Sequence, residues 1–313
     1  PWNPPYILSS DEALSMEKLP KSIIIVGGGV IGIEWASMLT DFGVNVCVIE
    51  QGKHILPTED TEIARQVAMS LQKRGVKLLT NAKLLTDKVH IKAGQVVATV
   101  EQQGEQEILT ADNMMVAIGR EANVSDLGLQ NTAIKLDRGY IQTNACYQTE
   151  ESHIYAIGDV IGGLQLAHVA SYEGITAVEH MADQDPLLLT ERQIPTCVYS
   201  YPEVAKIGLT EQQAREQGYQ IKTGKFSFQA NGKALIEGHQ DGFVKIIADE
   251  KTDDILGIHM VGPHVTNLIS EGSLATLLDA TPWEISQAIH PHPTLSEVTW
   301  EAALAVDNLQ LHG

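Results

Sequence analysis

The segment that most constrains this chain is a strand, a glycine-rich turn, a helix and a second strand in direct succession. Ser22–Val26 reads SIIIV, which is typical of a strand buried on both faces. Residues 27–32 read GGGVIG and match the pattern G-x-G-x-x-G. A helical pattern covers residues 33–42, and a second predicted strand ends on Glu50. This order predicts an α/β fold with a Rossmann-like domain.

Each part of the turn has a physical role in binding a dinucleotide. Gly27 permits the tight turn, Gly29 lets the backbone approach a pyrophosphate, and Gly32 lets helix and strand pack closely. The N–H groups and the dipole at the helix start attract phosphate. Glu50 can accept hydrogen bonds from a ribose and would repel a 2′-phosphate, so we expect NAD rather than NADP. A turn without a ligand is the alternative, which the complete strand–turn–helix–strand context disfavours. The predicted NAD-binding residues here are Gly27, Gly28, Gly29, Val30, Ile31, Gly32 and Glu50.

A second informative segment, residues 290–297, reads HPHPTLSE. The prolines favour extended chain and keep both imidazoles out of a regular helix. His292 with Glu297 suits a general base whose orientation a carboxylate fixes. Thr294 and Glu297 also have capping-box spacing, and from these eight residues alone a helix cap with packed histidines is the favoured interpretation. We expect no metal site, because the two histidines lack helical i,i+4 spacing and no cysteine cluster completes a ligand set.

Composition excludes several classes of function. The net charge of −19 over 313 residues opposes binding to nucleic acid or to anionic membranes, and no apolar run is long enough to span a bilayer. The three widely spaced cysteines form neither a disulfide framework nor a redox motif, and a cytoplasmic, reducing compartment fits them. Residues 1–7 are predicted to be a linker, as expected if the chain begins part-way through a longer protein.

The pattern continues with alternating elements. We predict a helix over residues 60–74 and an antiparallel meander within residues 88–118, broken at the glycines 94 and 104. Residues 154–159 are predicted to form a buried strand ending on Asp159, which either holds a hydroxylated ligand or caps the helix expected over 166–181. Further strands are expected at 76–79, 114–118, 196–199, 206–208, 222–227, 243–248 and 255–260, and further helices at 211–216, 265–279 and 296–306. Thr281 has capping-box spacing with a proline at the first helical position.

Five motifs, in this order, resemble the FAD-dependent pyridine nucleotide–disulfide oxidoreductase family. They are VGGGVIGIE at 26–34, VAIGR at 116–120, IYAIGDV at 154–160, YPEVA at 201–205 and the HPHPTLSE segment. The resemblance covers essentially the whole chain. It implies an NAD-binding domain over residues 8–120, the C-terminal part of an FAD domain over 121–190, and an α+β dimerisation domain over 191–313.

The resemblance also implies roles for individual residues. His292 is the acid/base and Glu297 its orienting partner. Gly119 lies on the nicotinamide side, and Glu34 near the contact of nicotinamide and flavin. Asp159 binds the ribityl chain of FAD. The helix start that faces the flavin comprises Gln165, Leu166, Ala167 and His168.

The implied reaction is oxidation of a lipoyl dithiol by NAD through a redox disulfide and FAD. Implied partners are a second copy of the chain, a lipoyl domain and the acyltransferase core of a 2-oxo acid dehydrogenase complex. Two family features, an N-terminal FAD-binding segment and a Cys-x4-Cys redox pair, do not occur in this sequence. We therefore expect the isolated chain to be an inactive NAD-binding and dimerising module. Other open alternatives are family members such as glutathione or mercuric reductase.

Overall fold

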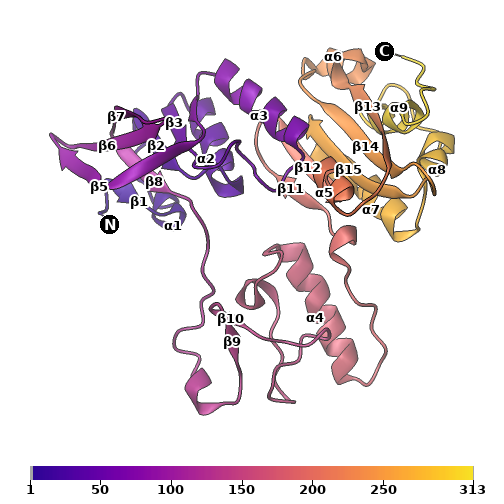
Figure 1. Ribbon diagram of the computed structural model, residues 1–313, viewed down its shortest axis with the longest axis horizontal. Coiled ribbons are helices and arrows are strands. Elements are labelled where there is room, and N and C mark those ends of the chain that lie inside the picture. Colours follow the sequence, from indigo (N-terminus) through magenta and orange to yellow (C-terminus); the bar gives the residue numbers. More distant parts are fainter. Residues whose placement is uncertain (1–2, 313) are drawn as a thin grey trace. The chain divides into compact units, whose positions relative to one another are not determined.

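The structure is a computed structural model that describes residues 3–312 and contains two compact units (Figure 1). One unit comprises the chain up to Ile118 and from Cys197 onward, and the other comprises Gly119–Thr196. The breaks fall within a few residues of the domain boundaries expected at 120 and 190. One compact unit contains both the region expected to bind NAD and the region expected to dimerise. The assignment of these regions as separate domains stays a prediction.

The N-terminal part of the first unit is built on a five-stranded parallel sheet. Its strands, in spatial order, are β1 (Ile7–Leu8), β8 (Asn113–Val116), β2 (Ser22–Val26), β3 (Asn45–Ile49) and β4 (Lys77–Leu79). The β-branched run of β2 occupies the centre, where both faces are covered. Ile23 and Ile25 face a core shared with two helices, and Ile24 faces a second core. The predicted strand–turn–helix–strand unit is therefore confirmed.

Two helices cover one face of this sheet, α2 (Val30–Asp41) and α3 (Thr61–Lys73) (Figure 1). The helix predicted over 60–74 is confirmed, and Asp60 caps it by accepting a hydrogen bond from Glu62 N at 3.0 Å. The short helix α1 (Ser10–Ala13), which the sequence reasoning did not predict, starts with a capping box. None of the helices between residues 3 and 312 combines the length and apolar character that a bilayer crossing requires.

The antiparallel meander predicted before residue 118 is confirmed and covers the other face of the parallel sheet. It consists of β5 (Ala82–Lys92), β6 (Gln95–Gln102) and β7 (Glu105–Ala111). Its two turns, at residues 93–94 and 103–104, place both central residues at positive φ, the conformation of tight hairpin turns. The meander begins earlier than predicted, because β5 pairs with β6 from Ala82 onward.

The C-terminal part of the first unit is a second five-stranded sheet with helices. Its strands, in spatial order, are β11 (Thr196–Val198), β12 (Glu203–Gly208), β15 (Ile255–Gly262), β14 (Phe243–Asp249) and β13 (Ile221–Ser227). Its helices are α5 (Glu211–Glu216), α6 (Gly232–Glu237), α7 (Val265–Leu277), α8 (Pro282–Gln287) and α9 (Glu297–Ala305), with a 3₁₀ turn, η4 (Phe228–Ala230). This α+β arrangement agrees with the sequence prediction. A Cβ at Gly224 on β13 would overlap backbone atoms of α9, so this glycine lets helix and strand lie in close contact.

Residues 119–196 form the second unit, which contains little regular structure. Its elements are η1 (Leu129–Asn131), β9 (Leu136–Asp137), β10 (Tyr140–Ile141), η2 (Gly158–Ile161), α4 (Ala167–Met181) and η3 (Glu191–Gln193). The prediction of a buried strand over 154–159 is wrong. Tyr155 forms only an isolated bridge with Gln148, and η2 starts at Gly158. A buried strand needs neighbouring strands to pair its backbone, and the described part of this unit offers only the β9–β10 pair.

The linker predicted over residues 1–7 also needs correction. Ile7 is buried and pairs with β8, and Asn3 forms a bridge with Ile7. Residues 1 and 2 lie outside the described part of the chain. The apolar pair Ile7–Leu8 completes the edge of the parallel sheet, which explains why residues so close to the prolines are ordered into a strand.

Candidate functional site

The glycine turn has the geometry that the sequence predicts. Gly27 has a φ of +112°, and a Cβ there would overlap the carbonyl oxygen of Ala117 on the loop after β8. A Cβ at Gly32 would overlap the carbonyl oxygen of Gly27. These two glycines therefore allow the turn and bring the start of α2 against the end of β2.

Gly29 is different, because a Cβ there would meet nothing within 4 Å. No packing requirement in the described chain explains this glycine, and the space beside its backbone is open. Gly29 is the N-cap of α2, and no side-chain hydrogen bond caps the helix within the described residues. The N–H groups of Val30, Ile31 and Gly32 thus start a twelve-residue helix. Open space beside such a helix start fits a pyrophosphate.

Glu50 follows the end of β3 and points at the glycine turn. Its Oε2 accepts a hydrogen bond from Gly28 N at 2.7 Å, and its Oε1 accepts one from Gly52 N at 2.5 Å. Two backbone donors thus fix the carboxylate, and each oxygen retains a further lone pair. The position fits an acceptor for the hydroxyl groups of a ribose next to the pyrophosphate site. The glycine turn and Glu50 together fit NAD.

Glu34 lies one turn further along α2. Its Oε1 accepts a hydrogen bond from Tyr199 N at 2.8 Å, where the chain has just left β11. Burial raises the pKa of Glu34, and the Tyr199 hydrogen bond opposes that shift only partly. Glu34 is therefore a half-buried carboxyl group close to the glycine turn, in the region where the two parts of the first unit meet.

The predicted flavin residues lie together in residues 119–196. Arg120 forms an ion pair with Asp159 and donates a hydrogen bond to the Gln165 carbonyl at 3.3 Å. Gln165 Nε2 donates to the Asp159 carbonyl, also at 3.3 Å. Gly119 precedes Arg120 directly. The Asp159 side chain is about half exposed, at 45%. Its lone pairs leave capacity for a further donor, which fits a hydroxylated chain.

The start of α4 follows these residues. Leu166 is its N-cap, and within the described residues no side-chain hydrogen bond caps the helix. Ala167 begins the fifteen-residue helix, and His168 Nε2 contacts the Pro195 carbonyl oxygen at 2.9 Å. The free N–H groups at this start could stabilise negative charge on a neighbouring group. This arrangement fits the predicted contact with a flavin.

His292 and Glu297 are hydrogen-bonded as the sequence suggests. His292 Nδ1 donates to Glu297 Oε1 at 2.9 Å, and the His292 side chain is 77% exposed. Because a carboxylate occupies Nδ1, the neutral ring has its lone pair on Nε2. That nitrogen has no partner among the described residues. The geometry therefore provides an oriented and accessible base.

Only one half of the capping box predicted at Thr294 forms. Glu297 Oε2 does accept a hydrogen bond from Thr294 N at 2.8 Å. The Thr294 hydroxyl, however, donates to the Pro291 carbonyl at 2.7 Å, and α9 has Ser296 as its N-cap. The helix begins later than the capping-box spacing implies. Glu297 is thereby free to orient His292 with its other oxygen.

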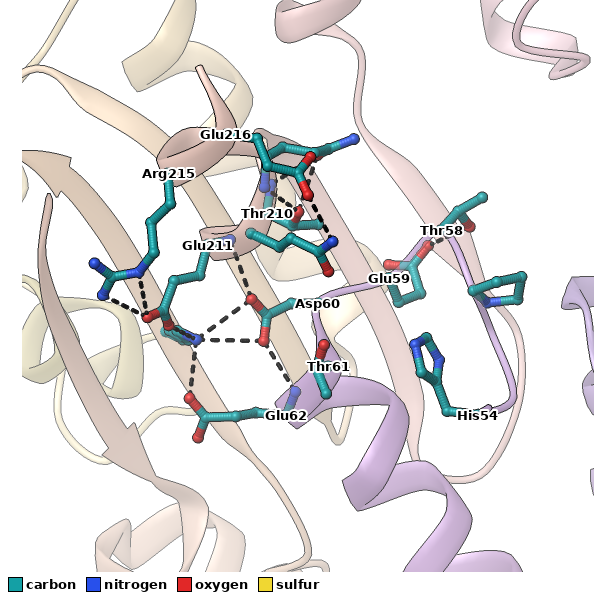
Figure 2. A pocket seen from close by; sticks show the side chains of 14 residues that line it. His54, Thr58, Glu59, Asp60, Thr61, Glu62, Thr210, Glu211, Arg215 and Glu216 are labelled. Atoms are coloured by element: carbon teal, nitrogen blue, oxygen red, sulfur yellow. Dashed lines mark hydrogen bonds and ion pairs between the residues drawn. The ribbon is translucent and has the colours of Figure 1, made fainter. Parts of the chain in front are cut away.

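The structure also contains a buried charge network that the sequence reasoning missed. Figure 2 shows Asp60, Glu62 and Glu211, and all three carboxylates contact Lys245 Nζ, at 3.3, 2.9 and 2.7 Å. The Lys245 side chain is only 2% exposed. These residues line a pocket of about 540 Å³ between the start of α3 and α5. The sequence signal that could have predicted this network is Lys245 itself, a charged residue within the apolar run of β14. Within residues 3–312 no group of three or more His, Cys, Asp or Glu side chains is arranged so that it could hold a metal ion.

Comparisons with known proteins agree with these observations. Residues 5–174 match the model of the pyridine nucleotide-disulphide oxidoreductase family, and residues 194–303 match the model of its dimerisation domain. A dihydrolipoyl dehydrogenase from Bacillus subtilis is 58% identical over 98% of this chain and 65% of its own length. One from Zymomonas mobilis is 42% identical over 98% of this chain and 66% of its own length.

Solved structures of two related proteins have a fold similar to that of this chain. LpdA from Mycobacterium tuberculosis has a TM-score of 0.86 at 30% identity, covering 95% of this chain and 64% of that one. The flavoprotein disulfide reductase RclA from Escherichia coli has a TM-score of 0.88 at 27% identity, covering 96% and 68%. The chain thus spans about two thirds of the length of the relatives it matches. Its fold, its two family models and its relatives show that the chain belongs to the pyridine nucleotide-disulphide oxidoreductase family.

Proposed function

We propose that this chain is the NAD-binding and dimerising part of a dihydrolipoyl dehydrogenase. The hydrogen bond between His292 and Glu297 carries the proposal, because it leaves Nε2 of an exposed imidazole free to exchange protons with a thiol. The names of the relatives at 58% and 42% identity support the same enzyme. The proposed reaction converts a dihydrolipoyl dithiol and NAD⁺ into the cyclic disulfide, NADH and a proton.

The proposed NAD site comprises the 27–32 turn and Glu50. In this proposal the pyrophosphate binds beside Gly29 at the start of α2, because glycine has no side chain and the space next to its backbone is open. Glu50, held by Gly28 N and Gly52 N, accepts hydrogen bonds from the adenosine ribose. Its negative charge disfavours the 2′-phosphate of NADP. Glu34 and Gly119 lie on the nicotinamide side.

The proposed flavin contacts come from Asp159 and the start of α4, residues 165–168. When bound, FAD supplies the two-electron relay between a redox disulfide and NAD. Asp159 would hold the hydroxyl groups of its ribityl chain. The uncapped N–H groups at the start of α4 would stabilise negative charge on the bound group.

His292 carries the proton chemistry in this proposal. Its Nε2 takes the proton of one substrate thiol, so that the thiolate can attack a disulfide sulfur. Glu297 holds the Nδ1 proton and stabilises the imidazolium that forms. The proton is then released to solvent, which the 77% exposure of His292 permits. The two electrons of the dithiol leave as hydride on NADH.

The proposed partners follow from the family. The match of residues 194–303 to a dimerisation domain supports a homodimer. A lipoyl domain brings the dithiol, and the acyltransferase core of a 2-oxo acid dehydrogenase complex carries that domain. The free cysteines fit a cytoplasmic, reducing compartment.

A second candidate function is an NAD-binding, dimerising module without redox activity. It is favoured by the state of the cysteines. Cys47, Cys146 and Cys197 are all free. Burial raises the pKa of Cys47 to about 11 and also raises that of Cys197, so neither is a reactive thiolate near neutral pH. The described cysteines therefore provide no two reactive thiols that could form a redox pair.

One experiment separates the two candidates. The intact protein that contains this chain is purified, and NAD⁺-dependent oxidation of dihydrolipoamide is measured for the parent and for His292→Gln. The enzyme proposal predicts loss of dithiol oxidation in the variant with NADH–dye activity largely retained, because hydride transfer between nicotinamide and flavin needs no thiol base. Equal loss of both activities, or no dithiol oxidation in the parent, contradicts it.

A further inference from the structure

His290 lies two residues before His292 and has the opposite environment. Its side chain is 6% exposed, compared with 77% for His292. Its Nδ1 contacts the Ala288 carbonyl oxygen at 2.9 Å, and its Nε2 contacts Glu271 Oε1 at 2.8 Å. Both ring nitrogens thus face oxygen acceptors, and both can donate only when the ring is doubly protonated.

The surroundings of His290 favour that charged form. The Glu271 hydrogen bond and charge raise the pKa of His290, with smaller contributions from Ala288 and from Glu297, against the opposing effect of burial. The carboxylates whose charge acts on His290 are Glu271 on α7 and Glu297 on α9, and His292 follows two residues later on the same loop. The two acceptors on its ring nitrogens and the charge of these carboxylates therefore favour the protonated form of His290, and one of the carboxylates also orients the proposed base.

Glu271 belongs to a helix that is itself firmly held. α7 packs on β12 and β15 through Val265, Ile269, Gly272 and Ala275, all of which are buried. The loop over residues 288–296 has no regular secondary structure of its own. His290 attaches the first half of this loop to α7, and Glu297 attaches the second half to α9 through Thr294 N. His292 lies between the two attachments.

We propose that His290 is a positioning residue for His292, acting as a charged clamp that joins the loop to Glu271. This inference rests on the proposed function, since it assigns His290 to the same reaction. His290 itself does not contact substrate in the proposal. It fixes the backbone on which His292 and Glu297 meet, and a displacement of about 1 Å at a reacting group can lower a rate about 100-fold.

The first test uses nuclear magnetic resonance on the chain with labelled histidines. His290 should keep both ring protons to a higher pH than a histidine in an unstructured peptide, whose pKa is about 6.5. In Glu271→Gln, His290 should lose one ring proton at lower pH than in the parent, because an amide replaces the carboxylate. In His290→Gln, the Hδ1 resonance of His292, protected by Glu297, should broaden or disappear. Titration of His290 at or below the pH found for a histidine in an unstructured peptide, or an unchanged His292 signal, overturns the clamp.

The second test uses the intact protein and dihydrolipoamide. His290→Gln and Glu271→Gln should each lower kcat about 10- to 100-fold with little change in KM and with NADH–dye activity retained. The double variant His290→Gln/His292→Gln should be no slower than His292→Gln alone, because a clamp acts only through the base. The matched control is His90→Asn, which should match the parent.

Additive losses in the double variant, or equal losses of dithiol and dye activity, overturn the proposal in favour of a merely structural histidine. If His290→Gln does not fold, Glu271→Gln in both assays still decides, because it removes the charge and keeps an acceptor. If the parent oxidises no dihydrolipoamide, the proposed function fails. The resonance of His292 in the chain then still shows whether His290 orders it.

Discussion

Glu297 makes two hydrogen bonds to one short loop, accepting from His292 Nδ1 with one oxygen and from Thr294 N with the other, at 2.9 and 2.8 Å. The carboxylate therefore fixes both the ring and the backbone that carries it. An amide at this position keeps acceptor capacity on only one of its two atoms and removes the charge that stabilises an imidazolium.

We predict that Glu297→Gln is a milder version of His292→Gln in the intact protein. Loss of the base should lower dithiol oxidation by about 10²- to 10⁴-fold. Loss of its orienting charge should lower it by about 10- to 100-fold. Steady-state rates with dihydrolipoamide check both values, and NADH–dye activity is the control. A Glu297→Gln variant slower than His292→Gln would show that the carboxylate has another role.

The nucleotide preference should depend on Glu50. The chain should bind NAD more tightly than NADP, because the carboxylate beside the glycine turn repels a 2′-phosphate. Glu50→Ala should narrow that difference, mainly by weakening NAD binding. Calorimetric titration of both nucleotides with the parent and the variant provides the measurement. Tighter binding of NADP to the parent would refute the assignment.

The chain should form a colourless dimer. Residues 194–303 match a dimerisation domain, whereas the sequence contains only one G-x-G-x-x-G turn, which belongs to the proposed NAD site. Asp159 and the start of α4 are expected to contact the ribityl chain and the flavin ring. They do not replace the glycine turn and helix start that would bind the diphosphate of FAD. Sedimentation and an absorbance spectrum of the purified chain check the prediction. A flavin band at one per chain, or a monomer, contradicts it, and dihydrolipoamide turnover by the chain alone should be undetectable.

Lys245→Met should destabilise the first unit strongly. The variant leaves Asp60, which is 3% exposed, in a buried site without its cation. Breaking a buried ion network by removing one partner costs about 3–5 kcal/mol. Lys225→Met is the matched control, because the Lys225 side chain is 51% exposed and pairs only with Glu62 among the described carboxylates, so its effect should stay below about 1 kcal/mol. Urea unfolding followed by tryptophan fluorescence measures both.

The same network should make the free energy of unfolding depend on pH in the acidic range. Hydrogen bonds from Lys245 and Arg215 lower the pKa of Glu211 in the folded chain. A carboxyl group with a lowered folded pKa stabilises the fold above its unfolded pKa of about 4.3 and loses that contribution as pH falls through the folded value. The unfolding free energy should therefore fall below about pH 4.3. The slope should be shallower in Lys245→Met, and an unchanged slope would exclude this origin.

Local sequence signals predicted those elements whose determinants are local. The helix at Glu211–Glu216 was predicted with the observed ends, and the capping box at Thr281 with Pro282 at the first helical position is confirmed. The strand Ser22–Val26 was predicted from its β-branched run alone. In each case the residues that decide the structure lie within a few positions of one another.

Signals that depend on distant partners were misjudged. The apolar run at 154–159 looks like a strand, but its pairing with the distant segment around Gln148 extends over a single bridge, which is too short to form a regular strand. Lys245 was overlooked because its partners Asp60 and Glu62 lie far earlier in the chain. The pairing of His290 with Glu271 was likewise invisible, since nothing local indicates which helix the loop contacts.

The core beneath α2 and α3 also contains Val198, Val204 and Val261 from the C-terminal sheet. Residues 8–120 alone would consequently expose an apolar surface where these three valines pack, and would also separate Asp60 from Lys245. Cutting the gene at residue 120 should therefore yield an aggregating fragment rather than a portable nucleotide-binding domain. The segment with the glycine turn and the C-terminal sheet should therefore unfold together, as parts of one compact unit.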